Sequence, residues 1–389
     1  MTILIIGIGN PIPSFILRRL RALKDQGIQL LVVADSDQQV DLKGITVIRV
    51  RKASDTLSLV SAGLTVMRNP FLFFKLLKSR PELPFTQRLR WAVKYYPLAR
   101  IASPDVIHIQ WLSSVVEFAW LRSFFSVPIV ASARGSQVTV YPITRPGYRH
   151  TIDRAIQLAD YIHCVSHDIA SACERLGAPA EKLIVNYNGI DLQKFKEAPE
   201  AEARNKFTII SVGSLMWRKG LYYQLQVLKL LTQEKKDVEL VWIGDGPDKE
   251  GLLYTAHILG IEDRIRFVGK VNADQLVLWL TKADLYLSTS VAEGLANSVV
   301  EAIACGLPVL AFACEGMEEA LIPGANGFIL PVGDVQGMAE KVIYLLDNST
   351  ERNKMALASR QHACQNFDEN KWVLMMVEKY IGIKSEKIE

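Results

Sequence analysis

Cysteine and histidine are scarce in this sequence, and their spacing predicts neither disulfides nor a metal site. The 389 residues include five cysteines and six histidines. No two cysteines form a C-x-x-C pair, so the sequence shows no disulfide framework and no zinc spacing. The histidines do not form an H-E-x-x-H pattern. We therefore expect no metal and no other cofactor, and a reducing cytoplasm is the simplest location.

Long apolar runs and a signal peptide are also lacking. No uninterrupted apolar run approaches the roughly 18–20 residues that span a bilayer, so we expect no transmembrane helix. The first residues, MTILIIG, have neither the basic start nor the small-residue cleavage site of a signal peptide. They are typical of a buried first strand. A composition of 49% hydrophobic and 22% charged residues excludes a disordered or low-complexity chain.

Neither sign of charge is in large excess, but the net charge of +4 is unevenly distributed. Residues 1–200 carry 25 Lys and Arg against 16 Asp and Glu, whereas residues 201–389 carry 20 against 25. A basic half joined to an acidic half suggests that the first half meets an anionic partner. Chance clustering of charges is an alternative of equal weight.

Short apolar runs alternate with helical patterns along nearly the whole chain, which predicts parallel sheets with crossover helices. The expected strands are 2–7, 28–34, 46–50, 105–109, 128–132, 160–165, 183–187, 207–212, 238–243, 264–268, 284–288 and 308–311. The pattern breaks between Asn188 and Asn205, which is typical of a linker. We therefore predict an α/β protein with two doubly wound, Rossmann-like domains, over residues 1–197 and 206–366.

The loop after the first strand contains Gly7 and Gly9 before a helix begins. Glycines let the backbone approach a ligand, and a helix N-terminus attracts phosphate. The dinucleotide fingerprint G-x-G-x-x-G is broken at Ile12, although Asp35 could mimic a ribose-binding acid. NAD binding is therefore a weak alternative to a plain strand-to-helix turn. The D-x-D pattern at residues 35–37 adds no third metal ligand.

A second candidate loop follows the strand that ends near Val212. Gly213 and Ser214 are small residues there, and Arg218 and Lys219 follow at the expected helix start. Arginine binds phosphate oxygens with two donors, and lysine supplies a point charge. A merely solvated basic turn is disfavoured, because cations oppose the helix dipole at this end. The loop therefore suits a diphosphate.

The most informative stretch is residues 288–302, where two carboxylates flank a strand-to-helix loop. Glu293 falls in the loop, and Glu301 falls about one turn into the helix in an apolar neighbourhood. A carboxylate can accept the two hydrogen bonds of vicinal sugar hydroxyls. A glycosidase pair is the chemical alternative, but such acids stand on opposite walls of a cleft. Helix capping is the structural alternative.

These residues, together with others, resemble glycosyltransferase family 4, the retaining sugar-nucleotide-dependent enzymes of the GT-B fold, and in particular its polysaccharide-biosynthesis members. The resemblance covers nearly the whole chain, and many markers occur in the family's order. They are DVIHIQW at 105–111, VS at 165–166, NGID at 188–191, VG at 212–213, KG at 219–220, GDGP at 244–247, the E-x7-E from Glu293 to Glu301, EAIACGLPV at 301–309 and NG at 326–327. The resemblance implies two domains facing each other across a cleft, with a final helix in 367–389 that crosses back to the N-terminal domain.

The resemblance also implies roles for individual residues. Glu301 would bind the ribose of the donor nucleotide, Glu293 would contact the transferred sugar, and Lys219 would neutralise the diphosphate. The loop of Gly7 and Gly9 would close over the diphosphate from the other domain. The expected donor-binding residues are Gly7, Gly9, Gly213, Ser214, Arg218, Lys219, Glu293, Gly294, Leu295, Ala296, Asn297 and Glu301.

Two positions depart from the family pattern. Ser214 stands where family members usually have arginine, and Arg218 is expected to reach in instead. Arg134 stands where many members have histidine, after the fifth strand. Arginine cannot act as a base at neutral pH, so Arg134 would stabilise negative charge or hold an oxygen atom. We expect His108, Arg134 and Gly135 on the acceptor side, with Arg134, Lys219 and Glu293 as the catalytic residues.

Residues 67–100 contain eight Lys and Arg and one acid, interleaved with aromatic and aliphatic residues. Such a segment is typical of a contact with an anionic membrane surface, which would bring the cleft to a lipid-linked acceptor. The alternative is a pair of core-packed helices with solvated cations. Nucleic-acid binding has no supporting motif, and we expect none.

The sequence thus predicts a metal-independent, retaining hexosyltransferase that builds a cell-surface polysaccharide or a lipid-linked glycan. Its partners would be a nucleotide sugar and a glycan or lipid-linked acceptor. Its expected location is cytoplasmic, with peripheral contact to the inner face of the membrane. The alternatives are a sugar-nucleotide epimerase or hydrolase of the same fold, an NAD-dependent oxidoreductase, and a non-catalytic binding protein.

Overall fold

The structure is a computed structural model that describes residues 1–40, 42–50, 69–196 and 206–386. The chain forms two compact units. The first unit comprises Met1–Val165, Ala170–Asn186 and Val373–Glu389, and the second comprises Ser166–Ile169 and Tyr187–Trp372. The predicted linker extends into residues 197–205, which lie outside the described residues.

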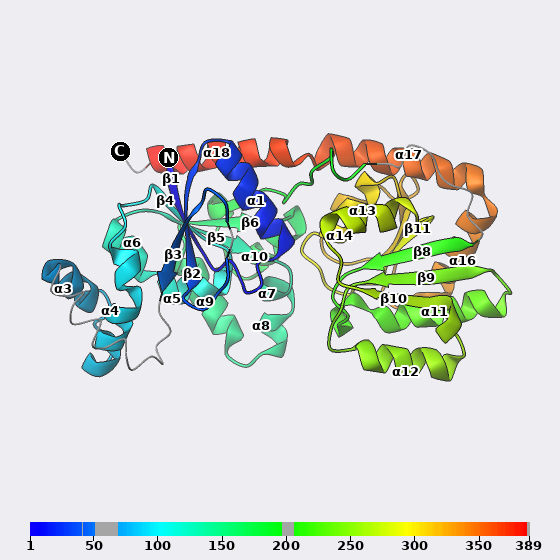
Figure 1. The fold of residues 1–389 in the computed structure, drawn as a ribbon, viewed down its shortest axis with the longest axis horizontal. Helices are drawn as coiled ribbons and strands as arrows, with labels where there is room; N and C mark the ends of the chain where they lie inside the picture. Colours follow the sequence, from blue (N-terminus) through cyan, green and yellow to red (C-terminus); the bar gives the residue numbers. More distant parts are fainter. Residues whose placement is uncertain (41, 51–68, 197–205, 387–389) are drawn as a thin grey trace. The chain divides into compact units, whose positions relative to one another are not determined.

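The first unit is built on a parallel sheet of seven described strands in the order β3-β2-β1-β4-β5-β6-β7 (Figure 1). Its strands are β1 (Thr2–Ile6), β2 (Gln29–Asp35), β3 (Thr46–Val50), β4 (Val106–Ile109), β5 (Ile129–Ala133), β6 (Tyr161–Cys164) and β7 (Leu183–Val185). The helices between them are α1 (Ser14–Asp25), α3 (Pro70–Lys78), α4 (Phe85–Ala99), α5 (Val115–Phe118), α6 (Trp120–Phe125), α7 (Ser136–Thr139), α8 (Tyr141–Thr144), α9 (Tyr148–Leu158) and α10 (His167–Arg175), of which the first three residues belong to the second unit. Each of the seven strands expected from the sequence is present.

The second unit has a parallel sheet of six described strands in the order β10-β9-β8-β11-β12-β13. Its strands are β8 (Phe207–Val212), β9 (Val238–Ile243), β10 (Ile265–Gly269), β11 (Leu285–Ser288), β12 (Val309–Phe312) and β13 (Gly327–Leu330). Its helices are α11 (Leu221–Gln233), α12 (Lys249–Leu259), α13 (Ala273–Thr281), α14 (Asn297–Ala304), α15 (Met317–Ala320), α16 (Val335–Asp347) and α17 (Ser349–Asn366). The prediction of two doubly wound α/β domains is confirmed.

Side chains of the second sheet alternate between two apolar layers, as the period of a strand requires. Ile210, Tyr286 and Val309 pack into one layer with α14. Their chain neighbours Ile209 and Leu285 pack into the other layer with α11 and α16. Burial on both faces explains why these strands are continuous apolar runs in the sequence.

Strand β13 is missing from the sequence prediction. It is four residues long and begins at Gly327, directly after Asn326. An added Cβ at Gly327 would lie 2.2 Å from the carbonyl oxygen of Val309 on β12. The glycine that indicates a turn in the sequence is therefore required here by the close approach of a neighbouring strand.

The last helix, α18 (Glu369–Ser385), supplies part of the core of the first unit. Val373, Met376, Tyr380 and Ile383 lie on one helical face and are buried in the same cluster as residues of β1, β2 and α1. Lys384 also forms an ion pair of 2.9 Å with Asp105, just before β4. No helix among the described residues is both long and apolar enough to cross a membrane.

The strand order reverses direction once in each sheet, and this positions the candidate site. In the first unit the switch lies between β1 and β4, and in the second between β8 and β11. The chain leaves these two neighbouring strands toward opposite sides, so the loops at their carboxyl ends frame a crevice. Gly7 and Gln110 lie in such loops of the first unit, and Lys219 and Glu293 in those of the second.

A chain of buried polar side chains crosses the core of the first unit. Tyr380 contacts Nδ1 of His108, whose Nε2 lies 2.8 Å from the Ser132 hydroxyl. That hydroxyl lies 2.8 Å from Nδ1 of His163. Burial, reinforced by the charge of Arg19, holds the pKa of both histidines well below the ordinary value. Both rings are therefore neutral at physiological pH.

We predict that these two histidines make the protein less stable in mild acid. In the unfolded chain a histidine has a pKa of about 6.5 and gains a proton below that pH. In the folded protein these two rings stay neutral at that pH because their pKa is lower. The free energy of unfolding should therefore be fully present above pH 6.5 and fall below it, by up to about 1.4 kcal/mol per pH unit for each histidine. Thermal unfolding at pH 7.5 and pH 5.5 measures the loss. The variant His108→Gln should lose clearly less than the wild type, and an equal loss would contradict the prediction.

Candidate functional site

The loop after β8 in the second unit holds Lys219 against Gly213. Gly213 has φ +154°, and an added Cβ would lie 2.9 Å from Cε of Lys219. The Thr289 hydroxyl, in the loop after β11, donates to the carbonyl oxygens of Lys219 (3.0 Å) and Gly220 (2.9 Å). The two loops at the switch point are therefore tied together by hydrogen bonds.

Lys219 and Glu293 meet across these loops. Nζ of Lys219 lies 2.5 Å from Oε1 of Glu293, and the two side chains are only 23% and 16% exposed. The pair places a cation and a hydrogen-bond acceptor side by side at the carboxyl edge of the sheet. The lysine could bind a diphosphate, and the carboxylate could accept hydrogen bonds from the hydroxyls of a sugar.

Helix α14 carries the second carboxylate of the pair that the sequence singled out. Glu301 is 9% exposed, which agrees with the expected apolar neighbourhood. Tyr286 of β11 is fully buried nearby, and burial together with the charge of Glu301 and Glu293 raises its pKa. The start of α14 is held by Asn188, whose amide donates to Oδ1 of Asn297 at 3.1 Å.

The remaining donor residues expected from the sequence differ in exposure. Gly294, Leu295 and Ala296 are buried, while Ser214 is exposed. The Arg218 guanidinium donates to Sδ of Met216, 3.2 Å away in the same loop. The structure thus brings Lys219 into contact with Glu293, and the reach of Arg218 toward a diphosphate stays a prediction.

In the first unit, the loop after β1 lies against the loop after β4. Gly7 and Gly9 have φ +80° and +79°, which favours glycine. An added Cβ at Gly7 would lie 3.0 Å from Cδ1 of Trp111. The Gln38 amide contacts the carbonyl oxygen of Gly9. This glycine loop is therefore fixed on both sides by side chains of the first unit.

Arg134 follows β5 and lies beside the same switch point. Its Nε donates to the Gln110 carbonyl oxygen (3.2 Å), and its NH2 donates to the Gln110 side chain (3.0 Å). The guanidinium also lies 4.7 Å from the ring centroid of Phe15 and 5.8 Å from that of Trp111. Burial and the charge of Arg19 lower the pKa of Arg134 to about 9, so it remains a cation at neutral pH.

The expectation that His108 lies on the acceptor side is corrected by the structure. His108 is 0% exposed, and its two ring nitrogens contact Tyr380 and Ser132. It lies within β4, before the loop that reaches the carboxyl edge. A ring enclosed by core side chains has no atom left for a substrate, so His108 is part of the core. Gly135 does lie beside Arg134 and has φ +30°.

Several residues at these sites were given no role from the sequence, although Gln110, Trp111 and Asn188 lie in motifs that carry the family resemblance. Gln110 and Trp111 contact Arg134, and Tyr286 and Asn188 support α14. Gln110 and Trp111 directly follow a predicted strand, and that position could have indicated them. Asn188 is 109 residues away from Asn297, so no local pattern connects the two.

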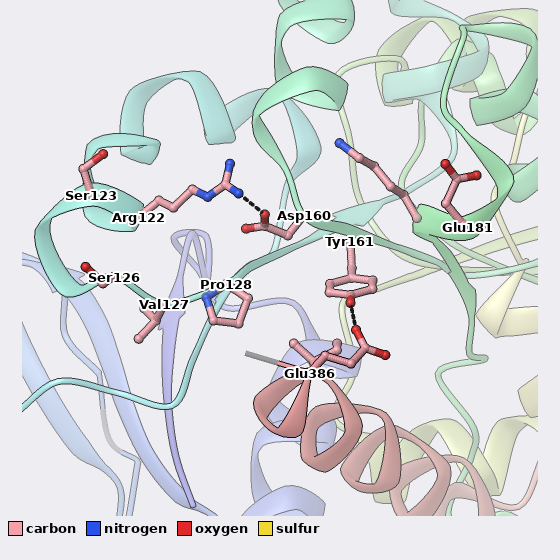
Figure 2. A pocket seen from close by; sticks show the side chains of 11 residues that line it. Arg122, Ser123, Ser126, Val127, Pro128, Asp160, Tyr161, Glu181 and Glu386 are labelled. Carbon is pink, nitrogen blue, oxygen red and sulfur yellow. Dashed lines mark hydrogen bonds and ion pairs between the residues drawn. The ribbon is translucent and has the colours of Figure 1, made fainter. Parts of the chain in front are cut away.

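A pocket of about 910 Å³ lies elsewhere in the first unit, beside the end of α18 (Figure 2). It is lined by residues that precede β5, β6 and β7, at the amino edge of the sheet. Arg122 pairs with Asp160 at 2.6 Å, and Tyr161 contacts Glu386 (Figure 2). The candidate site residues follow the carboxyl ends of their strands, at the opposite edge of the sheet. This pocket is therefore separate from the candidate site.

Two protein-family models match the chain in succession. The model described as Glycosyltransferase Family 4 matches residues 14–194, and the model described as Glycosyl transferases group 1 matches residues 193–362. The first match covers β2 to β7 of the first unit but not β1, and the second covers all six described strands of the second unit. Both models describe the same type of enzyme.

Curated relatives agree with these matches. The chain is 26% identical over 295 residues to N-acetyl-alpha-D-glucosaminyl L-malate synthase of Bacillus anthracis, which covers 73% of this chain and 76% of the relative. It is 28% identical to the amylovoran biosynthesis glycosyltransferase AmsK of Erwinia amylovora, over 61% of each chain. It is 27% identical to the teichuronic acid biosynthesis glycosyltransferase TuaC (putative in its name) of Bacillus subtilis, over 66% of this chain and 67% of the relative.

Solved structures share the fold. HepE of Anabaena, solved in complex with UDP and glucose, has a TM-score of 0.76 at 20% identity and covers 98% of this chain and 100% of its own. Sucrose-phosphate synthase of Thermosynechococcus elongatus has a TM-score of 0.80 at 17% identity, over 99% and 100%. At such low identity these likenesses establish the fold alone.

We predict that Lys219→Ala abolishes most of the catalytic rate. The change removes the cation at the switch point and leaves the Glu293 carboxylate to repel a diphosphate. Loss of one stabilising contact to a leaving group typically costs about 100-fold in rate or more. The control is Lys354→Ala, which breaks a lysine–glutamate pair with Glu351 on α17. Steady-state sugar transfer measures both variants, and an unchanged kcat and donor KM for Lys219→Ala would exclude the role.

Proposed function

This chain belongs to glycosyltransferase family 4 and has the GT-B fold, and we propose that it moves a hexose, with retention of configuration, from a nucleoside-diphosphate sugar to a hydroxyl of a glycan or lipid-linked acceptor. The observation that carries the proposal is the contact between Lys219 and Glu293 at the switch point of the second unit. Relatives named for amylovoran, teichuronic acid and colanic acid biosynthesis support a cell-surface polysaccharide as the product.

The donor binds at the second unit. Lys219 neutralises the diphosphate, and the buried Glu301 accepts hydrogen bonds from the ribose hydroxyls. Glu293 and the backbone amides that follow it meet the transferred sugar. HepE, solved with UDP-glucose, supports a uridine nucleotide as the first donor to test. The family assignment leaves the NAD-dependent alternative, which rested on Gly7, Gly9 and Asp35, without support.

The reaction needs positioning and charge stabilisation from the protein. The acceptor oxygen forms a bond to the anomeric carbon on the face from which the diphosphate departs, and the acceptor proton passes to that diphosphate. Lys219 stabilises the charge that develops on the leaving group, while Glu293 orients the sugar. No covalent intermediate with the protein is required.

In the first unit, Arg134 is the residue to which we assign a role in the reaction. It remains a cation at neutral pH and is oriented by both oxygens of Gln110. A guanidinium held in this way can bind an oxyanion or an acceptor hydroxyl, but it cannot take a proton. We assign Arg134 to charge stabilisation and Gly135 to the backbone beside it.

A membrane-bound acceptor fits the surface of α3. Phe71 and Phe74 are 80% and 60% exposed on one face of this helix, together with Lys78, whereas the Lys75 ammonium donates to the Phe124 carbonyl oxygen at 2.8 Å. The opposite face buries Phe73 and Leu76, and α3 packs against α4. Both helices lie at the periphery of the first unit (Figure 1). Exposed aromatic rings beside cations are suited to an anionic lipid surface. The buried face of α3 supports the alternative of core-packed helices, and the exposed face supports the proposed membrane contact.

We predict that a nucleoside diphosphate raises the melting temperature and that Glu301→Ala removes the effect. A ligand that binds only the folded state adds about 2.7 kcal/mol of stability at 100 times its Kd. UDP, GDP, ADP and TDP are compared with NAD by thermal shift. A shift with one diphosphate is expected, and a shift with NAD alone would contradict the proposal. Glu351→Ala on α17 is the control and should retain the shift.

We also predict binding to anionic vesicles. The wild type should co-sediment with vesicles of phosphatidylglycerol and phosphatidylcholine at low salt. Replacing Phe71 and Phe74 by serine should weaken binding at least about tenfold, because each exposed ring that enters the lipid contributes roughly 1.5–3 kcal/mol. The matched control replaces Tyr254 and Ile258, which are 68% and 64% exposed on α12. Equal weakening by both pairs, or no binding by the wild type, would exclude α3 as the contact.

A further inference from the structure

Ser166 holds the loop that carries Glu293, although it is distant in sequence. The Ser166 hydroxyl donates to the carbonyl oxygen of Gly294 at 2.7 Å and accepts from the amide of Ile169 at 3.1 Å. Ser166 is 0% exposed and belongs with Gly294 to the second unit. Its donor and acceptor capacity is thus used within the protein.

The residues after Ser166 exchange helix caps with α15. The Glu319 carboxylate on α15 accepts from the amides of His167 (2.8 Å) and Asp168 (2.9 Å) at the start of α10. The Asp168 carboxylate in turn accepts from the amide of Gly316 (2.7 Å), just before α15. The Tyr187 hydroxyl donates to Glu319 at 2.6 Å. These bonds satisfy amides that have no partner within either helix.

The same exchange closes the other side of the Gly294 carbonyl. Gly316 has φ +73°, and an added Cβ would lie 2.3 Å from the Gly294 oxygen. The carbonyl therefore lies between the Gly316 backbone and the Ser166 hydroxyl. Gly294 directly follows Glu293 in the chain. Contacts that fix the Gly294 carbonyl therefore also restrain the backbone from which the Glu293 side chain extends.

We propose that Ser166 is a positioning residue for the sugar half of the donor. The inference rests on the proposed function, in which Glu293 and the amides after it meet the transferred sugar. Ser166 touches no substrate and acts only through the Gly294 carbonyl. The Ser166 hydroxyl contacts Gly294 and Ile169, and neither of these serves the diphosphate or the ribose in the proposed function. Loss of Ser166 therefore affects recognition of the sugar and spares recognition of the nucleotide.

The experiment compares two affinities in one variant. Isothermal titration measures Kd for UDP and for UDP-glucose, with GDP and GDP-mannose as the second pair of probes. In Ser166→Ala the affinity for the diphosphate should stay within about twofold. The affinity for the sugar nucleotide and kcat/KM should fall about tenfold, the equivalent of one buried hydrogen bond.

The matched control is Ser359→Ala. Ser359 is also 0% exposed in the second unit, and its hydroxyl donates to a backbone carbonyl, that of Asn326, at 3.2 Å. Ser359→Ala should leave the affinities for the diphosphate and for the sugar nucleotide unchanged. It should lower the free energy of unfolding about as much as Ser166→Ala does. Ser166→Cys, which keeps the side-chain size and a weak donor, should fall between the wild type and Ser166→Ala, and it serves if the alanine variant does not fold.

The outcomes separate the inference from the function on which it rests. If the wild type binds these probes and Ser166→Ala weakens the diphosphate and the sugar nucleotide equally, or neither, the positioning role is overturned and the proposed function stands. If the wild type binds no diphosphate, both are overturned. A selective loss of the sugar nucleotide in Ser166→Ala alone supports the inference.

Discussion

The reversal of strand order between β8 and β11 is the constraint on which the donor site depends. Parallel strands bring their carboxyl ends to one edge, and at the reversal the two adjacent loops leave in opposite directions. The loop after β8 supplies Lys219 and the loop after β11 supplies Glu293, so their contact follows from the topology. The first sheet repeats this order, which places the Gly7 loop beside Trp111.

Much of the fold could be predicted because each signal was local. Strands buried on both faces are continuous apolar runs, and the loops of the candidate site begin directly after such runs. Lys219, Glu293 and Glu301 could be singled out for this reason. Strand β13 could not be predicted, because a glycine such as Gly327 is expected both in a turn and in a strand that lies close to its neighbour, and the sequence alone does not distinguish the two. How Gly213 accommodates Lys219 is likewise visible only in three dimensions.

The errors concern polar residues whose partners are far away in sequence. His108 lies in a motif beside Gln110 and Trp111, yet its partners are Tyr380, 272 positions later, and Ser132. Arg134 was proposed as a site residue from the sequence, whereas Gln110, which accepts its hydrogen bonds, was given no role. A polar residue of the core and a polar residue of a site both form hydrogen bonds when they are buried. They can be told apart only by the partners to which they are bonded.

The central claim is that a nucleoside diphosphate binds between the two loops at the reversal in the second sheet. Hydrogen–deuterium exchange of the backbone amides, with and without saturating UDP or GDP, tests it most directly. The account predicts slower exchange in residues 213–220 and 288–301 together, since one ligand contacts both loops. Protection confined to residues 7–13 and 35–38 of the first unit would contradict it.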